Sequence, residues 1–437
     1  MKRITIIGTG YVGLVSGAGI SNFGHLVRCL DIDKQKIDLL NDGSIPIYES
    51  GLKKLIARSV NAKRLTFTVD AEEAIKWAEV IFIAVGTPQS ENGDADISAV
   101  IAVAEQIGKN LNNYKVISTK STVPIGTGKL IQKIIDQNNL DKIKYDYCSN
   151  PEFLREGAAV RDFLHPDRIV LGATSGKAFE YLKDVYRPLY INETPMVHTT
   201  VETAEMIKYA ANAFLAIKIS YINEVANLCD EIGADVHVVA KTLGMDGRIS
   251  PKFLHPGPGF GGSCFPKDTK ALVEIAKKYK IDMVTVTAAI EANKSQRKRM
   301  LNKLNELLDN NLKGKVIAIL GLAFKQETDD VRESPAIEII SGIHDEGGIV
   351  KAYDPIANNS MKEFFPALDY KSNWHEAVKG SDAAVIMTEW NEFRSMDLEK
   401  LKILMSQSVV LDTRNILNVS ELKRLGFKYD NVGRRVA

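Results

Sequence analysis

Short apolar runs alternate with longer helix-like stretches along the first 200 residues of the chain. Strand-like runs occur at residues 4–7, 26–31, 80–85, 116–120 and 145–149. The run at 80–85 is apolar at every position, which is expected of a strand covered on both faces in a parallel sheet. The pattern predicts an α/β domain built on a doubly wound sheet.

The pattern changes near residue 200 and changes back near residue 315. Residues 201–230 contain neither glycine nor proline and place apolar residues at helical spacing, which predicts a helix about 45 Å long. Strand-like runs return at residues 315–320, 349–353, 383–387 and 409–411. We therefore expect two doubly wound Rossmann-like domains, residues 1–199 and 299–437. Between them, residues 200–298 would form an all-helical dimerisation region around the long central helix.

The composition narrows the class of protein mainly by what it lacks. The chain has 437 residues with 45% apolar content, too many for one core, and its formal net charge is +1. A balanced charge gives no reason to expect nucleic acid or an anionic membrane as a partner. No apolar run reaches the ~20 residues that span a bilayer, and the first strand-like run starts close to Met1. We expect a cytoplasmic protein.

A glycine-rich turn joins the first predicted strand to the first predicted helix. Gly8, Gly10 and Gly13 form the pattern G-x-G-x-x-G, and Asp31 ends the next strand. In this context the pattern is the fingerprint of dinucleotide binding, with the acid placed for the ribose hydroxyls. Asp31 would repel a 2′-phosphate and so favours NAD over NADP, although Lys36 nearby weakens that preference.

Two threonines follow later strands of the same predicted sheet. Thr87 comes after the strand at 80–85, and Thr122 after the strand at 116–120. Ligands bind at the carboxyl ends of such strands, so both are placed to touch a cofactor. The alternative is that each is a helix N-cap, where threonine is favoured anyway.

The segment at residues 253–268 has a composition that no regular helix or strand tolerates. It combines four glycines and three prolines with Cys264, Lys267 and Asp268, which predicts a tightly turned loop. Lys267 could hold a thiolate or an anionic ligand by its charge, and Asp268 could accept or relay a proton. The alternative is a buried cysteine in a surface turn. Cys29, Cys148 and Cys229 form no C-x-x-C pair, and we expect them to be core residues without a disulfide or metal.

Two further pairs of polar residues lie four positions apart in the sequence. Glu152 and Glu156 would share a face if their segment were helical, or would be a solvated helix start. Lys208 and Asn212 lie one turn apart on the long predicted helix, either as functional residues or as a snorkelling lysine beside a surface asparagine. That helix also predicts a homodimer. In the last third, three basic residues past strand ends suit phosphate binding, or serve only solubility: Lys325, Arg332 and Arg414.

Eight motifs in order resemble the UDP-glucose 6-dehydrogenase family, within the UDP-glucose/GDP-mannose dehydrogenase superfamily. They lie at residues 8–13, 46–49, 120–124, 150–157, 165–168, 208–212, 253–268 and 321–334. The resemblance implies oxidation of UDP-glucose to UDP-glucuronate by two NAD⁺, through a thiohemiacetal and a thioester on Cys264. The alternatives are a GDP-mannose or UDP-N-acetylmannosamine 6-dehydrogenase and, in another class, a catalytically silent nucleotide sensor. No catalytic position departs from the family pattern, but many members carry another residue at Gly86, ahead of the aspartate-rich loop at residues 91–96.

The resemblance also implies roles for individual residues. Lys208 would stabilise the oxyanion, Asn212 would bind the sugar or that oxygen, and Asp268 with Thr122 would orient a water. Glu156 would be the base for thioester hydrolysis. The NAD contacts would be Gly8, Gly10, Tyr11, Val12, Gly13, Asp31, Lys36, Thr87, Thr122, Glu156, Lys267 and Arg332. The UDP-sugar contacts would be Glu152, Phe153, Leu154, Arg155, Glu156, Lys208, Asn212, Arg248 reaching across the dimer, Phe253, Leu254, His255, Pro256, Gly257, Gly261, Phe324, Lys325 and Arg414.

Overall fold

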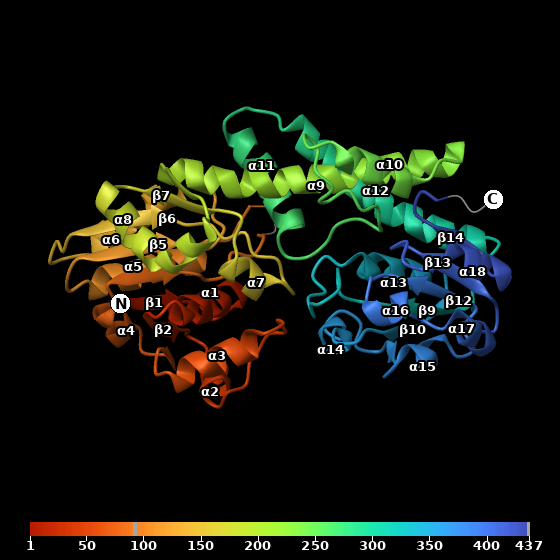
Figure 1. The fold of residues 1–437 in the computed structure, drawn as a ribbon, viewed down its shortest axis with the longest axis horizontal. Coiled ribbons are helices and arrows are strands. Elements are labelled where there is room, and N and C mark those ends of the chain that lie inside the picture. Colours follow the sequence, from red (N-terminus) through yellow and green to blue (C-terminus); the bar gives the residue numbers. More distant parts are fainter. Residues whose placement is uncertain (91–93, 435–437) are drawn as a thin grey trace. The chain divides into compact units, whose positions relative to one another are not determined.

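The computed structural model describes residues 1–90 and 94–434, so residues 91–93 of the loop at 91–96 lie outside the described part. Contacts divide the chain into two compact units (Figure 1). The N-terminal unit is Met1–Ala211 with Lys277–Tyr279, and the C-terminal unit is Asn212–Ala276 with Lys280–Ala437. The boundary falls inside one helix, α9 (Val201–Ile232). The three-domain division at residues 199 and 298 stays a prediction.

The N-terminal unit is built on an eight-stranded sheet with the order β3-β2-β1-β4-β5-β6-β7-β8. All neighbouring strands are parallel except β6 and β7. The strands are β1 (Arg3–Ile7), β2 (Leu26–Leu30), β3 (Leu65–Thr68), β4 (Val80–Ile83), β5 (Lys115–Thr119), β6 (Tyr145–Ser149), β7 (Ile169–Ala173) and β8 (Met196–Thr199). The helices are α1 (Tyr11–Asn22), α2 (Lys34–Asn41), α3 (Leu52–Asn61), α4 (Ala71–Trp77), α5 (Ser98–Asn110), α6 (Thr127–Asn138), α7 (Ala159–Leu164) and α8 (Gly176–Val185), followed by the 3-10 helix Arg187–Asn192.

Strand β4 shows why this sheet is buried on both faces. Val80 and Phe82 belong to the hydrophobic cluster that includes α1, α3 and α8. Ile81 and Ile83 belong to a second cluster, with α4, α5 and α6. Successive side chains of a strand point to opposite faces, so an all-apolar strand needs a helical layer on each side. The predicted burial of residues 80–85 is confirmed for the strand itself.

The C-terminal unit contains a six-stranded parallel sheet with the order β11-β10-β9-β12-β13-β14. Its strands are β9 (Val316–Leu320), β10 (Ile349–Tyr353), β11 (Asp369–Tyr370), β12 (Ala383–Ile386), β13 (Val409–Asp412) and β14 (Lys428–Asn431). Its helices, besides part of α9, are α10 (Val236–Met245), α11 (Phe265–Lys278, whose end belongs to the N-terminal unit), α12 (Val284–Leu307), α13 (Pro335–Asp345), α14 (Asn358–Met361), α15 (Trp374–Val378), α16 (Asn391–Arg394), α17 (Leu398–Leu404) and α18 (Val419–Arg424).

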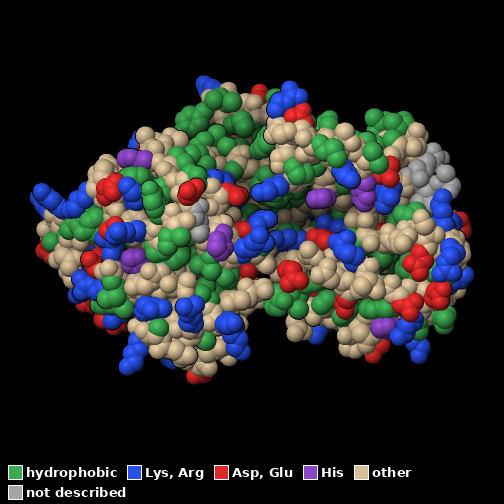
Figure 2. Space-filling view, in the orientation of Figure 1, with side chains coloured by type: hydrophobic (Ala, Val, Ile, Leu, Met, Phe, Trp, Pro, Cys, Tyr) green, Lys and Arg blue, Asp and Glu red, His purple; other side chains and the backbone are tan. Residues whose placement is uncertain are grey.

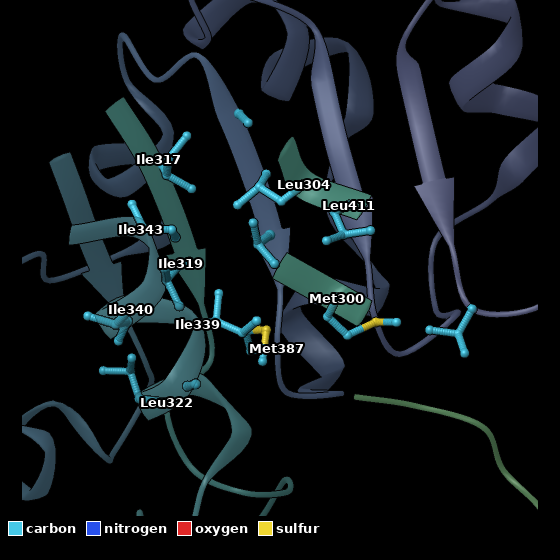
Figure 3. Packing of buried hydrophobic residues seen from close by; sticks show 14 of the residues in the cluster. Met300, Leu304, Ile317, Ile319, Leu322, Ile339, Ile340, Ile343, Met387 and Leu411 are labelled. Carbon is cyan, nitrogen blue, oxygen red and sulfur yellow. The ribbon is translucent and has the colours of Figure 1, made fainter. Parts of the chain in front are cut away.

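One face of the second sheet packs against α12. Met300 and Leu304 of that helix belong to one buried cluster with Ile319, Met387 and Leu411, all labelled in Figure 3. All five side chains are buried, so the C-terminal stretch of α12 is fixed on this sheet. The other face has its own cluster, which includes Trp374 and Phe393.

The fold class is confirmed, since both sheets have the doubly wound order and a long helix lies between them in the sequence. Helix α9 has 32 residues and stops before Gly233, whose φ of 74° is typical of a helix C-terminus. No helix within residues 1–90 or 94–434 has the length and apolarity needed to cross a membrane. On the face shown in Figure 2, basic and acidic side chains are interspersed, in keeping with the formal net charge of +1.

Candidate active site

The three fingerprint glycines have different structural reasons. Gly8 has φ of 105°, and a Cβ there would lie 2.6 Å from the Ala84 carbonyl oxygen. A Cβ on Gly13 would lie 1.9 Å from the Gly8 oxygen, so the fold itself requires both glycines. A Cβ on Gly10 would meet no protein atom within 4 Å. Gly10 is the N-cap of α1, so the open space above it suits a pyrophosphate at the helix N-terminus, and the turn fits NAD.

Asp31 is held in place by the same turn. Its Oδ2 accepts hydrogen bonds from Thr9 N and Thr9 Oγ1, both at 2.7 Å, and its Oδ1 accepts one from Asp33 N at 3.0 Å. Burial alone would raise the pKa of Asp31, but these hydrogen bonds outweigh it and lower the pKa. The carboxylate is therefore ionised and fixed. Lys36 Nζ lies 3.9 Å from Asp33 Oδ2. Sequence reasoning missed Thr9, which stands between the first two glycines.

Other predicted cofactor residues lie close to the turn or after β4 and β5. Tyr11 and Val12 open α1, and the Tyr11 hydroxyl accepts a hydrogen bond from Gly157 N at 2.7 Å. Thr87 Oγ1 donates to the Thr122 carbonyl oxygen at 2.8 Å. The alternative that both threonines are N-caps is wrong, because α5 begins at Ser98 and α6 at Thr127.

The segment of Glu152 and Glu156 is irregular, so the hypothesis of one helical face is wrong. Glu152 Oε2 accepts a hydrogen bond from Leu154 N at 2.5 Å, a local contact that competes with helix formation, and α7 begins only at Ala159. Gly157 N also donates to Glu49 Oε2 at 2.7 Å, a partner that sequence reasoning did not find.

Arg155 and Phe153, which are also predicted UDP-sugar contacts in this segment, have different partners. Arg155 is exposed and bonds to Asp162 through Nε and NH2, and the pKa of Arg155 is raised mainly by these side-chain hydrogen bonds. Phe153 has the Arg168 guanidinium 3.7 Å from its ring centroid.

Lys208 is buried and ion-paired. Its Nζ donates to Glu152 O at 2.8 Å and to Glu152 Oε1 at 2.9 Å, and both side chains are less than a tenth exposed. The alternative of a snorkelling lysine is wrong. One turn earlier on α9, Glu205 accepts hydrogen bonds from Gly126 N at 2.6 Å and Gly128 N at 2.8 Å. Burial raises the pKa of Glu205 to about 7.

The cysteine loop ends earlier than predicted. Helix α11 begins at Phe265, so Lys267 and Asp268 stand in its first turn and not in the loop. The Cys264 carbonyl accepts the first turn's hydrogen bond from Asp268 N at 2.8 Å. Pro266 is compatible with the helix because the first turn needs no N–H from it. Two of the glycines use positive φ, Gly259 and Gly262, and a Cβ on Gly261 would lie 2.2 Å from Glu333 O.

Helix side chains fix the backbone of this loop. Gly257 N donates to Asn223 Oδ1 at 2.8 Å, and Gln296 Nε2 donates to Gly257 O at 2.9 Å. Asn293 contacts both polar groups of Phe260, accepting from N at 2.7 Å and donating to O at 3.1 Å. Because the loop makes no ladder of its own, buried amides from α9 and α12 satisfy these groups. Sequence reasoning did not find these side chains.

Asp268 is fully buried, and each of its carboxylate oxygens accepts a hydrogen bond. Asn212 Nδ2 donates to Oδ2 and Lys267 Nζ to Oδ1, each at 2.6 Å. The alternative of a surface asparagine is wrong, since Asn212 is 6% exposed. The structure thus brings Asn212, Lys267 and Asp268 together in the C-terminal unit, beside the start of α11. Lys208, Glu152 and Thr122 belong to the N-terminal unit.

The predicted basic residues of the C-terminal unit differ in exposure. Arg414 Nε donates to Met387 O and its Nη2 to Phe324 O, both at 2.7 Å, so its guanidinium connects two strand-end turns. Arg332 is exposed and bonds to Asp330, as Arg248 does to Asp246. Lys325 Nζ lies 5.6 Å from the Phe324 ring centroid.

The strip that runs from Phe253 to Gly257 is mostly covered. Phe253 has φ of 65° and lies edge-on to Phe265 at 6.0 Å between ring centroids. Leu254, Pro256 and Gly257 are buried, whereas His255 is exposed.

The four cysteines divide as predicted. Cys29, Cys148 and Cys229 are buried, Cys264 is partly exposed, and none forms a disulfide. Burial raises the pKa of Cys29 to about 12 and also raises the pKa of Cys148 and of Cys229. Only Cys264 therefore combines access with a helix N-terminus, the setting that favours a reactive thiolate. No cluster of His, Cys, Asp or Glu suited to a metal occurs among the described residues.

Comparison with known proteins covers the whole chain. The UDP-glucose/GDP-mannose dehydrogenase family matches in three parts: its NAD binding domain at residues 2–190, its central domain at 202–295 and its UDP binding domain at 318–419. The UDP-glucose 6-dehydrogenase of Rhizobium meliloti is 47% identical over 435 residues, covering 99% of both chains. The UDP-glucose 6-dehydrogenase TuaD of Bacillus subtilis is also 47% identical, covering 99% of this chain and 94% of the relative.

Solved structures agree. A UDP-glucose dehydrogenase from Pyrobaculum islandicum superposes with a TM-score of 0.92 at 34% identity, covering 100% of this chain and 98% of that one. A UDP-D-ManNAc dehydrogenase from Pyrococcus horikoshii gives 0.87 at 26% identity and 99% coverage of both. With its fingerprint turn, its cysteine loop and all three family domains in order, this chain belongs to the UDP-glucose/GDP-mannose dehydrogenase family and carries that family's NAD-binding domain.

Proposed function

We propose that this protein is an NAD-dependent UDP-glucose 6-dehydrogenase. One UDP-glucose, two NAD⁺ and one water would give UDP-glucuronate, two NADH and three protons. The observation that carries the proposal is Cys264, the one partly exposed cysteine, which immediately precedes α11 and the Lys267 and Asp268 of its first turn. The support from outside the chain is its similarity to UDP-glucose 6-dehydrogenases along 99% of its length.

A thiol makes the second oxidation possible. The sugar C6 alcohol first loses a hydride and a proton to give an aldehyde, which has no hydroxyl to oxidise until a nucleophile adds to it. The Cys264 sulfur adds to C6 and the carbonyl oxygen takes a proton, giving a thiohemiacetal. Loss of a second hydride and the hydroxyl proton gives a thioester. Water then attacks C6, the C–S bond breaks, and the thiolate is restored with the carboxylate product.

The polar residues around these steps receive separate roles. Lys208 would stabilise the oxygen at C6 as it gains negative charge, because its ammonium is buried and held by Glu152. Asn212 would contact the sugar or that oxygen. Asp268, whose position is set by Asn212 and Lys267, would orient the hydrolytic water with Thr122, and Glu156 would be its base.

NAD supplies the hydride acceptor in both oxidation steps. The residues we assign to it are the fingerprint turn from Gly8 to Gly13, with Asp31 at the ribose, and Lys36, Thr87, Thr122, Glu156, Lys267 and Arg332. An ionised Asp31 beside the ribose would disfavour a 2′-phosphate, which supports NAD over NADP. For the UDP-sugar we assign Arg248, Phe253–Gly257, Gly261, Phe324, Lys325 and Arg414 in the C-terminal unit, and residues 152–156 with Lys208 in the N-terminal unit.

We also propose that the protein is a cytoplasmic homodimer. Phe214, Tyr221 and Leu228 repeat every seven residues on α9 and are 62%, 54% and 59% exposed. Residues at this spacing share one helix face, and an apolar stripe of this kind is typical of helix-to-helix association. In sedimentation, Leu228→Glu should convert a dimer to a monomer. A wild-type monomer would contradict the assignment. The four free thiols fit a reducing compartment.

The test of function is the amount of NADH formed per molecule of UDP-glucose consumed, measured beside GDP-mannose and UDP-N-acetylmannosamine. Two NADH per UDP-glucose would support the substrate and the full oxidation to the acid. One NADH would mean release of the aldehyde and would remove the role of Cys264. Turnover of another sugar nucleotide instead would assign the chain to a sister activity. No turnover with retained nucleotide binding, together with a Cys264 inert to alkylating reagents, would favour the sensor.

Cys264→Ser provides the matched control for the same assay. It should bind NAD normally but form no UDP-glucuronate, since oxygen is a poor leaving group from the acyl intermediate. Acid production equal to that of the wild type would exclude the thioester.

A further inference from the structure

Two buried lysines stand at opposite ends of strand β5. Lys115 opens the strand and Lys120 follows its last residue, Thr119. They are 0% and 4% exposed, and burial lowers the pKa of each to about 8. Lysine is almost never fully buried unless it is paired, because taking an ammonium out of water costs much free energy. Each of the two therefore requires an explanation.

Lys115 has a structural explanation. Its Nζ donates to Ala78 O at 2.6 Å, to Asn113 Oδ1 at 2.8 Å and to Lys76 O at 3.2 Å. Three acceptors match the three donors of an ammonium group. They lie at the amino-terminal edge of the sheet, whereas ligands of such sheets bind at the carboxyl edge.

Lys120 has no comparable set of partners. Its Nζ donates to Asn150 Oδ1 and to the Tyr186 hydroxyl, both at 3.2 Å, and within the described residues no carboxylate forms an ion pair with it. The rings of Phe82, Phe163 and Tyr186 surround the ammonium, with centroids 5.7 to 6.0 Å away. Stability alone would favour an apolar side chain of the same length here, because a half-satisfied buried charge weakens a core.

The Lys120 ammonium donates to Asn150, whose side-chain oxygen, side-chain nitrogen and backbone N–H all have partners. Asn150 Oδ1 accepts a hydrogen bond from the Tyr186 hydroxyl at 2.6 Å as well as from Lys120. Its Nδ2 donates to Val170 O at 2.9 Å and its backbone N to Thr119 O at 2.8 Å. Asn150 is therefore fixed to β5, to β7 and to the residue that follows α8.

Asn150 opens the irregular segment that carries Glu152, and Glu152 holds Lys208 through a carboxylate oxygen and its carbonyl. Glu152 and Lys208 are among the groups whose charge acts on Lys120, so positive, negative and positive groups occupy one buried region. A segment without helix or strand hydrogen bonds relies on such side-chain anchors for its position.

We propose that Lys120 is a positioning residue for Lys208: its ammonium, with Tyr186, fixes Asn150 at the start of residues 150–157, and that segment places the Glu152 carboxylate that holds Lys208. The role in the reaction rests on the proposed dehydrogenase function. The geometric part of the inference does not depend on it.

The test compares Lys120→Met with Lys115→Met, a buried lysine of the same strand that is far from the carboxyl edge. Lys120→Met should lower kcat by about 10- to 100-fold, because a misplaced catalytic group affects the transition state, and should leave KM within about threefold. Its Tm should equal or exceed that of the wild type, since a buried charge is removed. Lys115→Met should leave kcat per folded molecule unchanged and should lower Tm.

A second measurement does not need turnover. Hydrogen exchange of the Leu154 and Gly157 amides, which bond to Glu152 and Glu49, should accelerate at least about fivefold in Lys120→Met and stay unchanged in Lys115→Met. If Lys120→Met does not fold, Tyr186→Phe removes only a hydroxyl and should show the same two changes more weakly. Wild-type kcat and exchange in the variant that folds would overturn the proposal.

The two measurements also separate this inference from the proposed function. A wild-type enzyme that oxidises none of the sugar nucleotides would contradict the proposed function. Hydrogen exchange would then decide the placement of residues 150–157 alone: faster exchange in Lys120→Met supports the inference, and unchanged exchange overturns it.

Discussion

The six strands of the second sheet have the same order as the first six strands of the first sheet, but the two sheets use their carboxyl edges differently. Gly8 after β1 and Gly321 after β9 are equivalent: both have positive φ, and both donate a backbone hydrogen bond to the last residue of the next strand in the sheet, Leu30 or Tyr353. A Cβ on Gly8 would strike Ala84 and one on Gly321 would strike Thr388, each just past the strand on the other side. The crossover from the first strand is therefore built in the same way twice.

The acidic residue after the second strand shows the difference. Asp31 bonds to one turn residue, Thr9, and to Asp33, and its side chain stays partly open. Asp354 is 1% exposed and accepts hydrogen bonds from the N–H groups of Leu322, Ala323, Ile356 and Ala357, and from the Trp390 indole. The same position leaves its carboxylate partly accessible in one sheet and closes the turn in the other.

The helix after the turn also differs. In the N-terminal unit α1 starts at Tyr11, close enough to Gly8 that Gly13 must lack a side chain. In the C-terminal unit α13 starts only at Pro335, so no helix N-terminus follows Gly321 directly. A repeated fold does not repeat a dinucleotide site, because the site depends on a few positions at the turn.

The largest effect is expected from exchanging the two acids for alanine. Asp354→Ala leaves four backbone N–H groups and an indole without an acceptor and should cost about 3–5 kcal/mol of unfolding free energy. Asp31→Ala should cost only about 1 kcal/mol. Denaturant unfolding measures both. Equal losses of unfolding free energy would mean that Asp31 supports its turn as much as Asp354 does, and would contradict the contrast between the two positions.

The glycines give the next largest effect. Gly13→Ala places a Cβ against the Gly8 carbonyl and should cost about 3 kcal/mol, whereas Gly10→Ala meets no protein atom and should change stability by less than about 0.5 kcal/mol. Both should weaken NAD binding. Calorimetry with NAD, run beside thermal unfolding, separates the effects. Undiminished NAD affinity in Gly10→Ala would show that the open space there is not the pyrophosphate site.

The turn after the fifth strand gives a pH-dependent contrast. After β13 the turn is capped by the strand's own Asp412, but after β5 it is capped by Glu205 from α9. The pKa of Glu205 is raised to about 7, mainly by burial, so the folded protein binds a proton that the unfolded chain releases at lower pH. That contribution to stability is present below about pH 4.5 and is lost as pH rises through 7.

The wild type should therefore lose on the order of 2 kcal/mol of unfolding free energy between pH 5 and pH 8 through Glu205, and Glu205→Gln should not show this loss. The measurement is Tm of wild type and variant at both pH values, with the exposed Glu224→Gln as a control on the same helix. A wild-type Tm that falls no faster than that of Glu205→Gln would contradict the raised pKa.

The smallest expected effect concerns cofactor choice. Asp31→Ala should narrow the preference for NAD over NADP by about tenfold, because the repulsion of a 2′-phosphate is lost while the turn remains. The ratio of kcat/KM for the two cofactors measures this. Asp354→Asn should leave the ratio unchanged, and a shift there equal to that of Asp31→Ala would contradict the division of roles.

The parts of the site that sequence reasoning predicted are those whose signal is local. The strand, the glycines, the helix and Asp31 lie within 31 residues, and their spacing alone defines the turn. Asn293, which fixes Phe260 from 33 positions away, and Glu49, which fixes Gly157 from 108 positions away, have no such signal. The false expectation for residues 150–157 had the same origin, because distant residues such as Lys120 and Glu49 hold that segment. The extent of the cysteine loop is a different case, since α11 begins directly after Cys264 and Pro266 is compatible with a first helical turn.

Hydrogen bonds from buried side chains hold the backbone of the cysteine loop, so the loop becomes ordered when the chain folds and not when a substrate binds. At Gly257 and at Phe260, both the N–H and the C=O are bonded to buried side chains. These residues lose conformational entropy when the chain folds, so that part of the ordering cost is not incurred when a substrate arrives. Although the segment has no helix or strand, it is a preorganised surface, and an incoming sugar nucleotide meets a thiol whose main-chain support is already set.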